Sequence, residues 1–406
     1  MTRELLLLLA CAFAAMLGFG ITLPVLPYHI DRLAIGGGAS RETAVFHVGA
    51  ITGAFALAQV ISAPLWGRLS DRTGRRLPLL LGLAGNAASL AAFGVASSLP
   101  ALYAARLVGG TFSGAIVPAV TAYVADITDR RSLGRGLAWV GSAGSLGVVI
   151  GPALGAFLTT QKSVPGLSRG SSNADGFATP FLAAAGIVAL TWIVAARWLP
   201  AASSLKFKTQ SGRGADVADG RLVALRWLLP YAFLVQFGLA VFEGTFALHA
   251  SAEMGLGPKG MGWVFATCGL VMAVVQGTVI AWLLTRLQEA VLVAAGLLVM
   301  GAGLALLMLS GELGPILAFV GVFALGTALV TPAIASLVSK VTTGRAGAAL
   351  GLQNAAGSFG QAVGPPVGAS LLLLNVHAPY VGVALLLGVA AIAWALQSRS
   401  SFGSAE

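Results

Sequence analysis

Charged residues are scarce in this chain of 406 residues. Asp, Glu, Lys and Arg together make up 9% of the sequence, whereas hydrophobic residues make up 57%. Soluble proteins carry about 25% charged residues, so this chain has too little polar surface to cover a soluble globule of its size. The same composition excludes intrinsic disorder, because disordered chains are poor in apolar residues. The composition therefore predicts a membrane protein that crosses the bilayer many times.

Cysteine and histidine are rare as well, with two and four residues. Cys11 and Cys268 both lie in apolar runs, which argues against a disulfide or a zinc site. The polar connections contain no P-loop, no H-E-x-x-H motif and no nucleophile with a neighbouring base. We therefore expect no enzyme activity, no cofactor and no metal site.

Long apolar runs are abundant. A helix needs about 20 apolar residues to cross the hydrocarbon core, and runs of about that length occur twelve times. The first six are 5–30, 44–66, 77–97, 100–123, 134–158 and 179–198, and the second six are 227–251, 260–284, 288–310, 313–337, 347–373 and 378–397. The sequence predicts an all-α membrane protein of twelve transmembrane helices, with six-helix bundles at 1–198 and 227–406 joined by a polar cytoplasmic linker, 199–226.

The net charge of +10 would suggest nucleic-acid binding in a soluble protein. Here, however, 18 of the 24 Lys and Arg residues fall in connections on the side of the N-terminus, 5 fall on the other side, and Arg106 lies inside the fourth span. Such a bias is typical of cytoplasmic loops. We therefore expect both termini in the cytoplasm, a location in the inner (plasma) membrane and no nucleic-acid partner.

A pattern of glycine and proline recurs in the two halves of the chain. The pattern of the fifth span returns in the eleventh at an offset of 213 residues, as Gly147, Gly151, Pro152 and Gly155 and then as Gly360, Gly364, Pro365 and Gly368. Pro118 in the fourth span recurs as Pro332 in the tenth, an offset of 214. A near-constant offset indicates a duplicated six-helix unit. Parallel repeats of this kind place a substrate site near the midplane, between two pseudo-symmetric halves that rock against each other.

The connection between the second and third spans has the most specific pattern, Gly67-Arg68-Leu69-Ser70-Asp71-Arg72-Thr73-Gly74-Arg75-Arg76. Glycine allows a tight turn, and an acid among several cations can exchange partners between two helix arrangements. A loop that only anchors the topology requires neither the acid nor the glycines. The run matches the signature G-x-L-[AS]-D-[RK]-x-G-R-[RK] at every defined position, and by this match the chain resembles the major facilitator superfamily.

Other segments resemble the tetracycline/proton antiporters and related drug exporters of that superfamily. They are Gly18-Phe19-Gly20 and Pro24-Val25-Leu26-Pro27 in the first span, Tyr123 to Thr128 at the end of the fourth, and Gly147-x-x-x-Gly151-Pro152-x-x-Gly155 in the fifth, where Ala156 replaces the usual second glycine. The resemblance covers nearly the whole chain. It implies a secondary active transporter that works by alternating access and exports small amphipathic organic compounds in exchange for protons.

The resemblance also implies a conformational latch made of Gly67, Asp71, Arg72, Gly74, Arg75, Arg76 and Asp126. Asp71 would cap the start of the eleventh span, where a helix N-terminus favours a carboxylate by roughly 0.3–1 kcal/mol, and Arg75 would pair with Asp126. The matching connection in the second half is reduced to Thr285-Arg286, so we expect a one-sided latch. The repeated Gly-Pro pattern is either a hinge that also closes the cavity against ion leak or only a packing groove.

Two ionisable residues lie well inside predicted spans. An arginine costs at least about 2.5–3.5 kcal/mol at the centre of a span, so Arg106 should face the bundle interior and bind an acid, backbone carbonyls or substrate. The resemblance implies a part for it in proton transfer. Glu243 is the only carboxylate well inside a span, and such acids are functional candidates, although an ordinary cavity residue or a structural acid would also fit. We predict that Glu243 couples transport to protons and that Arg106 modulates it.

The chain departs from the tetracycline antiporters at two positions. Those proteins carry one acid at the position of Ala15 and another near Ser89, and both acids are absent here. Either Glu243 carries the coupling alone, or the protein is not proton-coupled in the way that the resemblance implies. The alternative function is a facilitator or proton symporter for a small metabolite such as a sugar or an organic acid.

Polar and aromatic residues inside the spans are the candidates for the substrate cavity. They are Gln59, Gln236, Phe237, Phe242, Gln353, Asn354 and Ser358. Such groups either bind a substrate or bond and pack against a neighbouring helix. We expect the protein to work as a monomer whose partners are the lipid bilayer, a small-molecule substrate and protons.

Overall fold

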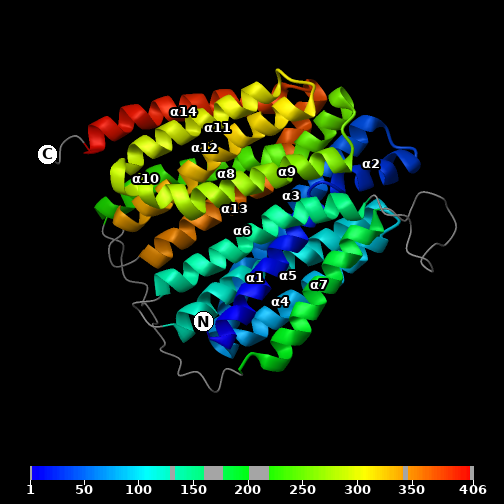
Figure 1. Cartoon of the computed structure of the whole chain (residues 1–406), viewed down its shortest axis with the longest axis horizontal. Helices are drawn as coiled ribbons and strands as arrows, with labels where there is room; N and C mark the ends of the chain where they lie inside the picture. The colour runs from blue at the N-terminus through cyan, green and yellow to red at the C-terminus, as the bar shows by residue number, and fades with distance from the viewer. Residues whose placement is uncertain (1, 129–132, 160–176, 201–218, 342–345, 403–406) are drawn as a thin grey trace. The chain divides into compact units, whose positions relative to one another are not determined.

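The computed structural model describes residues 2–128, 133–159, 177–200, 219–341 and 346–402. Within these ranges every regular element is a helix (Figure 1), which confirms the predicted all-α architecture. Most of the predicted linker lies outside the described residues. Its last part, 219–226, is helical and belongs to α8, so this helix begins earlier than hydropathy predicts.

The described helices group into two units. The first unit comprises Met1–Ser211 and Leu256–Ala266, and the second comprises Gly212–Gly255 and Thr267–Glu406. The helices of the first unit are α1 (Arg3–Thr22), α2 (Leu26–Gly36), α3 (Arg41–Thr73), α4 (Arg76–Val95), α5 (Leu99–Ile127), α6 (Leu133–Leu158) and α7 (Ala178–Trp198). The helices α8 (Asp219–Met254), α10 (Ile280–Arg286), α11 (Glu289–Leu307), α12 (Leu313–Val341), α13 (Ala346–Leu374) and α14 (Ala378–Phe402) lie in the second, and α9 (Pro258–Val274) begins in the first unit and ends in the second.

Most of these helices have the length and hydropathy of membrane spans. Eleven described segments are long and apolar enough to cross a bilayer. The remaining predicted span corresponds to the 29-residue helix α13, which is not among these eleven. The eighth predicted span is interrupted after α9 by a π-helical turn, Val275–Val279. The chain is therefore a multi-pass membrane protein.

The first predicted span, 5–30, is two helices rather than one. Hydropathy is continuous there, but α1 ends at Thr22 and α2 begins at Leu26. Pro24 causes the break, because proline has no N–H to donate and its ring clashes with the carbonyl of the residue four positions earlier. Pro27 lies in the first turn of α2, where the missing N–H costs nothing.

The predicted turn between the second and third spans is shorter than the motif suggests. Helix α3 continues through Gly67 to Thr73, so the expectation of a turn at Gly67 is wrong. The chain turns at Gly74, whose φ of 86° lies in the left-handed region that glycine adopts without steric cost. Only the second glycine of the motif is needed for the turn itself.

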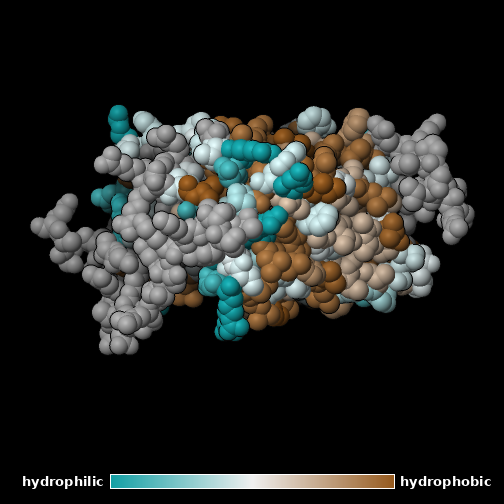
Figure 2. Space-filling model, turned by 90° about the horizontal axis from the view of Figure 1, so that it is seen from below, coloured by the Kyte–Doolittle hydropathy of each residue, from teal (hydrophilic) through white to brown (hydrophobic). Residues whose placement is uncertain are grey.

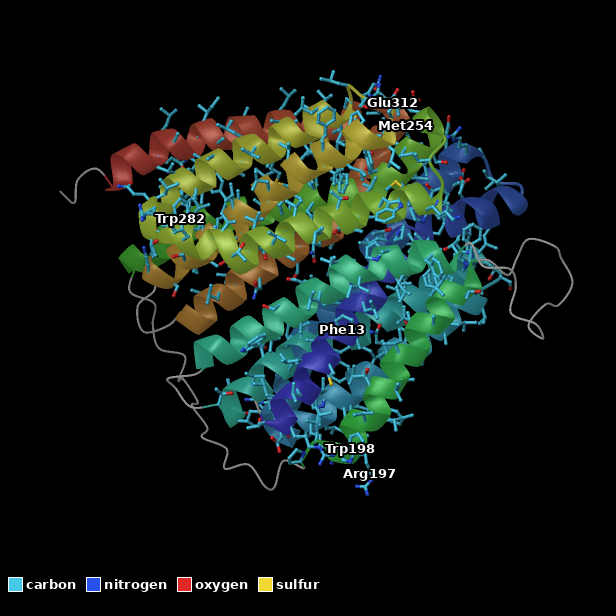
Figure 3. All side chains as sticks on the ribbon, viewed as in Figure 1. Phe13, Arg197, Trp198, Met254, Trp282 and Glu312 are labelled. Atoms are coloured by element: carbon cyan, nitrogen blue, oxygen red, sulfur yellow. The ribbon has the colours of Figure 1, made fainter. Side chains whose placement is uncertain are left out.

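The surfaces of the outer helices match a lipid environment. On α14, one face exposes Leu385, Val389, Ile392 and Leu396, each more than 60% exposed. Large apolar residues cover much of the face seen in Figure 2. At the end of α7, Arg197 points away from the helices (Figure 3), and the Arg3 guanidinium lies 4.8 Å from the ring centre of Trp198. Tryptophan and basic residues at helix ends are typical of a membrane–water boundary.

In the first unit, glycines bring α6 close to α1. A Cβ atom placed on Gly151 would lie 2.8 Å from the Cα of Gly20, and one on Gly155 would lie 2.6 Å from the carbonyl oxygen of Ile21. Small residues allow such an approach between two helix backbones. The glycine pattern found in the sequence is therefore the contact line of a helix pair.

The second unit repeats this arrangement between α13 and α8. A Cβ atom on Gly364 would lie 2.9 Å from the carbonyl oxygen of Phe237, and one on Gly360 would collide with the carbonyl oxygen of Phe233. The repeated sequence pattern thus corresponds to a repeated packing device, in equivalent helices of the two units.

Candidate functional site

The first unit encloses a small cavity among α1, α3, α4, α5 and α7. Its polar lining comes from Thr22, Asn86, Ser89, Arg106 and Ser113, and its aromatic lining comes from Phe19, Phe55, Phe93 and Phe181. The volume open to the centre of a water molecule is about 10 Å³, close to the roughly 10–15 Å³ that one ordered water needs. This cavity therefore accommodates a small polar group but not a whole organic molecule.

Arg106 is the charged residue of this cavity. Only 7% of the surface of Arg106 is exposed. Its guanidinium carbon lies 4.6 Å from the ring centre of Phe93 and 5.2 Å from that of Phe55. Its Nε has no hydrogen-bond partner, and no ion pair joins it to a carboxylate of the described residues. Arg106 thus faces the interior of the unit as predicted, and of the three expected kinds of partner (an acid, backbone carbonyls or substrate) an acid is not found among the described residues.

The two phenyl rings compensate only part of the cost of this charge. A cation over an aromatic ring gains about 0.5–2 kcal/mol, whereas burying an ion costs several kcal/mol even after relaxation. Ala15 and Ser89 line the same cavity at, or near, the positions where acids stand in the tetracycline antiporters. The cavity therefore keeps an excess of positive charge that the lining itself does not neutralise.

Two hydroxyl groups of the lining donate to backbone carbonyl oxygens. Ser89 Oγ donates to the carbonyl oxygen of Ala105 at 3.0 Å, and Thr22 Oγ1 donates to that of Gly18 at 2.9 Å. Gln59, a predicted cavity residue, donates from Nε2 to Ser113 Oγ at 3.2 Å. Gln59 therefore contacts the wall of this cavity through Ser113.

Glu243 lies in α8 of the second unit. Its side chain is partly buried, and its helix neighbours Phe242, Thr245 and Phe246 are fully buried. It forms no ion pair with a basic side chain of the described residues. A carboxyl group without a basic partner in a span carries its full burial cost when ionised.

The other candidates of the second unit fall into different environments. Phe237 stacks against Phe233 with ring centres 5.7 Å apart. Phe242 is fully buried and packs against Phe246 at 5.0 Å and Phe323 at 4.9 Å. Phe242 is thus a core residue, contrary to its prediction as a cavity residue, because the aromatic side chains of α8 and α12 fill the space around it.

Of the polar candidates of α13, Asn354 and Ser358 lie one helical turn apart on the same face, and Gln353 lies on another. Gln353 is buried and its Oε1 has no hydrogen-bond partner, whereas Asn354 is exposed and Ser358 is partly exposed. Gln236 on α8 lies beside α13, where a Cβ atom on Gly357 would be 3.0 Å from its Cγ. Gln353 and Gln236 are therefore packed between helices, whereas a place for Asn354 and Ser358 in a substrate cavity stays a prediction.

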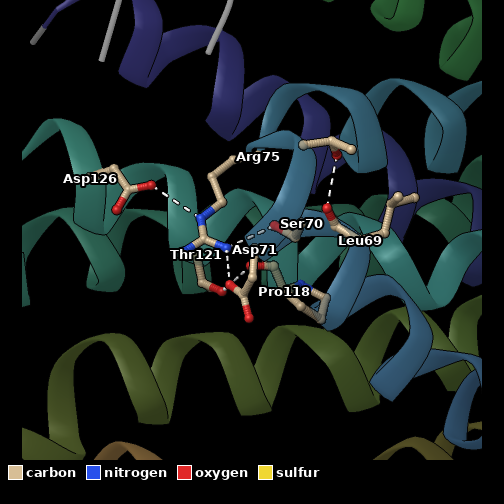
Figure 4. A network of polar contacts seen from close by, with 8 residues as sticks. Leu69, Ser70, Asp71, Arg75, Pro118, Thr121 and Asp126 are labelled. Carbon is tan, nitrogen blue, oxygen red and sulfur yellow. Dashed lines mark hydrogen bonds and ion pairs between the residues drawn. The ribbon is translucent and has the colours of Figure 1, made fainter. Parts of the chain in front are cut away.

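The predicted latch residues of the first unit meet at Arg75 (Figure 4). The Arg75 Nε lies 3.1 Å from Asp126 Oδ2, and its Nη1 donates to Asp71 Oδ1 at 2.7 Å and to Ser70 Oγ at 2.9 Å. Burial acts to lower the pKa of Arg75, but the hydrogen bonds to Asp71 and Asp126 outweigh it and hold that pKa above its ordinary value. Arg75 therefore stays charged in the folded protein throughout the physiological range of pH.

The neighbouring motif residues make fewer contacts. Arg76 donates from Nη2 to the carbonyl oxygen of Ala196 at 2.6 Å and so joins α4 to the end of α7. Arg72 and Gly67 are exposed, and Arg72 forms no ion pair with the part of the chain that the structure describes. The expected contact of Asp71 with the second half stays a prediction.

The second unit has a charge-reversed counterpart of the Arg75–Asp126 pair. Lys340 near the end of α12 forms an ion pair with Glu289 at the start of α11, and Ser336 donates to the same carboxylate at 3.0 Å. Glu289 and Lys340 follow Arg75 and Asp126 by 214 residues each, the offset that relates Pro118 to Pro332. The expectation of a one-sided latch stays a prediction, because this pair has no counterpart of Asp71, but applying the offset to every charged residue reveals that the ion pair itself is repeated.

We expect Lys340→Glu to lower the stability of the second unit, because it places two like charges in contact. The loss should be about 1 kcal/mol, the upper range for a pair with one exposed partner. The double variant Glu289→Lys/Lys340→Glu should recover most of it by restoring the pair in reverse. The midpoint of thermal unfolding, measured by size-exclusion chromatography of heated samples, reports both effects. Equal midpoints for the single and double variants would show that the pair contributes nothing.

Comparisons with known proteins agree with these features. The model of the Major Facilitator Superfamily matches residues 8–288 and 228–402. Multidrug resistance protein 2 of Bacillus subtilis (strain 168) is 28% identical over 95% of this chain and 93% of its own length. Quinolone resistance protein NorA of Staphylococcus aureus (strain COL) is 25% identical over 95% of each chain.

Among solved structures, the human organic anion transporter MFSD10 (TETRAN) superposes with a TM-score of 0.70 at 25% identity, covering 97% of this chain and 99% of its own. The family model spans nearly the whole chain, and the relatives are matched along almost their entire length. The chain therefore belongs to the major facilitator superfamily and is a multi-pass membrane transporter, not an enzyme.

Proposed function

We propose that this protein is a secondary active transporter that exports small amphipathic organic compounds in exchange for protons. The observation that carries the proposal is Glu243, an acid inside α8 with no basic partner among the described residues. Such a group is neutral when protonated and charged when not, so binding a proton changes the cost of burying it. The names of the bacterial relatives, a multidrug and a quinolone resistance protein, favour export of drug-like molecules.

In this mechanism the two units alternate the access of a shared substrate site between the two sides of the membrane. Protonation of Glu243 and substrate binding exclude each other, so each step of the cycle carries one or the other. The distribution of basic residues favours cytoplasmic termini in the plasma membrane. The Arg75–Asp126 and Glu289–Lys340 pairs support the proposal that ion pairs at helix ends stabilise one conformation of each unit. We take the working form to be a monomer in lipid.

Export predicts that the protein protects a sensitive cell. In a bacterial host that lacks its own drug exporters, expression of the wild-type chain should raise tolerance to several unrelated amphipathic compounds, measured as minimal inhibitory concentrations over a panel. A Glu243→Gln variant expressed to the same level is the control for protein load. Tolerance equal to that of the host with empty vector, across the panel, would contradict export.

A proton symporter or facilitator for a metabolite is the second candidate. The absence of acids at Ala15 and Ser89, both in the lining of the cavity, favours it. The direction of proton movement separates the two functions in proteoliposomes. Substrate added outside drives protons out of the vesicle lumen in antiport and into it in symport, and a facilitator moves none.

A further inference from the structure

We propose that the second unit has a binding site for a soft monovalent metal ion, copper(I), between His249, Met308 and His377. From the sequence we expected no metal site, and there these residues lie in three separate segments. The fold brings them to one end of the unit, where α8 and α11 end and α14 begins. Met254 and Glu312 mark this end in Figure 3. No residue of the proposed transport mechanism belongs to the site, so the site is independent of that mechanism.

His249 supplies the first metal donor. The residue is 1% exposed, and its Nδ1 is buried without a hydrogen-bond partner. The imidazole packs against Phe246, with ring centres 5.8 Å apart, and against Tyr380, with ring centres 5.1 Å apart. A buried nitrogen without a partner is costly, and a neutral imidazole nitrogen is the commonest metal ligand in proteins. A metal ion at Nδ1 would therefore satisfy this atom.

His377 supplies the second donor, because its ring faces that of His249. The two ring centres lie 5.5 Å apart, and the ring planes are inclined by 65°. Two imidazoles that bind one ion through nitrogens about 2.0–2.1 Å away, at a bond angle of about 110–120°, have ring centres roughly 5–6 Å apart. The His377 backbone is fixed in the turn before α14, where its N–H donates to Asn375 Oδ1 at 2.8 Å. The two rings thus have the spacing of two ligands of one ion.

Met308 supplies the third donor. It directly follows α11, and its Sδ lies 3.2 Å from Nδ1 of His377. A nitrogen about 2.0 Å and a sulfur about 2.3 Å from a shared ion lie roughly 3.2–3.7 Å apart. A thioether is only a weak hydrogen-bond acceptor, so the contact between these two atoms competes weakly with metal binding. The sulfur therefore completes a set of two imidazoles and one thioether.

The chemistry of the three donors selects the ion. No three His, Cys, Asp or Glu side chains of the described residues are grouped so that they could hold a metal ion, and the thioether of Met308 favours copper(I) over harder ions. All three donors are uncharged, and Phe246 and Tyr380 make the surroundings apolar, where a doubly charged ion costs more to desolvate than a singly charged one. His377 is exposed and Met308 is partly exposed, so an ion can reach the donors from the surface.

Copper binding by the purified protein tests the proposal. The wild type and its variants are incubated without oxygen with copper(I), which ascorbate keeps reduced, and are then desalted and analysed for copper by mass spectrometry. The wild type should retain close to one copper ion per chain. Met308→Leu, His249→Gln and His377→Gln should each weaken binding by at least the roughly 10–100-fold that loss of a group behind a metal ligand costs, and should retain little copper. Leucine and methionine are exchanged with small effects on stability, so Met308→Leu keeps the fold.

Met272→Leu and His47→Gln are the matched controls. Met272 is a partly buried methionine of α9, and Nδ1 of His47 already bonds the hydroxyl of Tyr103 at 2.9 Å. Both variants should retain as much copper as the wild type. The proposal is overturned if the wild type retains no more copper than Met308→Leu, or if the control variants lose as much copper as the variants of the site.

X-ray absorption at the copper edge of the loaded wild type gives a second readout that needs no variant. We expect one sulfur at about 2.3 Å and nitrogens at about 2.0 Å from the ion, close to the bond lengths that zinc makes to these atoms. Both cysteines are buried, so this sulfur is that of a methionine. A spectrum without a sulfur neighbour, or with sulfur neighbours alone, would reject the site.

Discussion

Glu243→Gln should reduce substrate-driven proton movement across proteoliposomes to the level of empty vesicles. Glutamine has the size and neutrality of the protonated acid but cannot release a proton, so the coupling step is lost while the packing of α8 around Phe242 and Phe246 is kept. A pH-sensitive dye trapped in the vesicle lumen measures the effect. Substrate binding should persist in the variant, because the protonation step and not the fold is removed.

Glu253→Gln is the matched control for this experiment. It removes an acid from the same helix, but at an exposed position near its end, and it should leave proton movement unchanged. Proton movement at the wild-type rate in Glu243→Gln would remove this residue from the mechanism. In that case the facilitator would become the better description of the protein.

Gly151→Ala and Gly360→Ala should each destabilise the protein by about 1–3 kcal/mol, as overpacking does. In both variants the new Cβ atom would meet the backbone of the partner helix, at Gly20 in α1 and at Phe233 in α8. Backbone cannot rotate away as a side chain can, so the helices must separate. The midpoint of thermal unfolding in detergent should fall for both variants.

Two other glycines of the same helices, α6 and α13, supply control variants that should not lower the stability. A Cβ atom on Gly141 in α6 or on Gly351 in α13 would meet no atom within 4 Å. Alanine is favoured over glycine in a helix by about 1 kcal/mol, so Gly141→Ala and Gly351→Ala should leave stability unchanged or raise it. Loss of transport at unchanged stability in Gly151→Ala would indicate a hinge at this position instead of a packing line.

Part of the candidate site was predictable because some signals are local. The motif that ends α3 predicted the pair of Arg75 with Asp126 through a family resemblance, and the two residues do lie 3.1 Å apart between Nε and Oδ2. The Glu289–Lys340 pair escaped the comparison of the two halves. Its charges are reversed, so it matches the first pair in position but not in residue type.

Other features depended on neighbours that are distant in the chain. Hydropathy predicted one helix over 5–30, but Pro24 divides it, since hydropathy does not register a missing backbone donor. Phe242, an aromatic residue inside a span, was a candidate for the cavity lining. Phe323 of α12 packs against its ring, however, so Phe242 belongs to the core. Whether an apolar residue faces a cavity or another side chain depends on the helix opposite.

The sequence by itself determined that this chain is an all-α membrane protein of the major facilitator superfamily, with a duplicated glycine pattern. Hydropathy, loop charge and short motifs depend only on residues that are close together in the sequence, so they can be recognised without a structure. Only the tertiary structure decided that Arg106 lies over two phenyl rings and forms no ion pair with an acid in the described part of the chain. A buried charge is defined by what surrounds it, and here the surroundings come from five different helices, α1, α3, α4, α5 and α7.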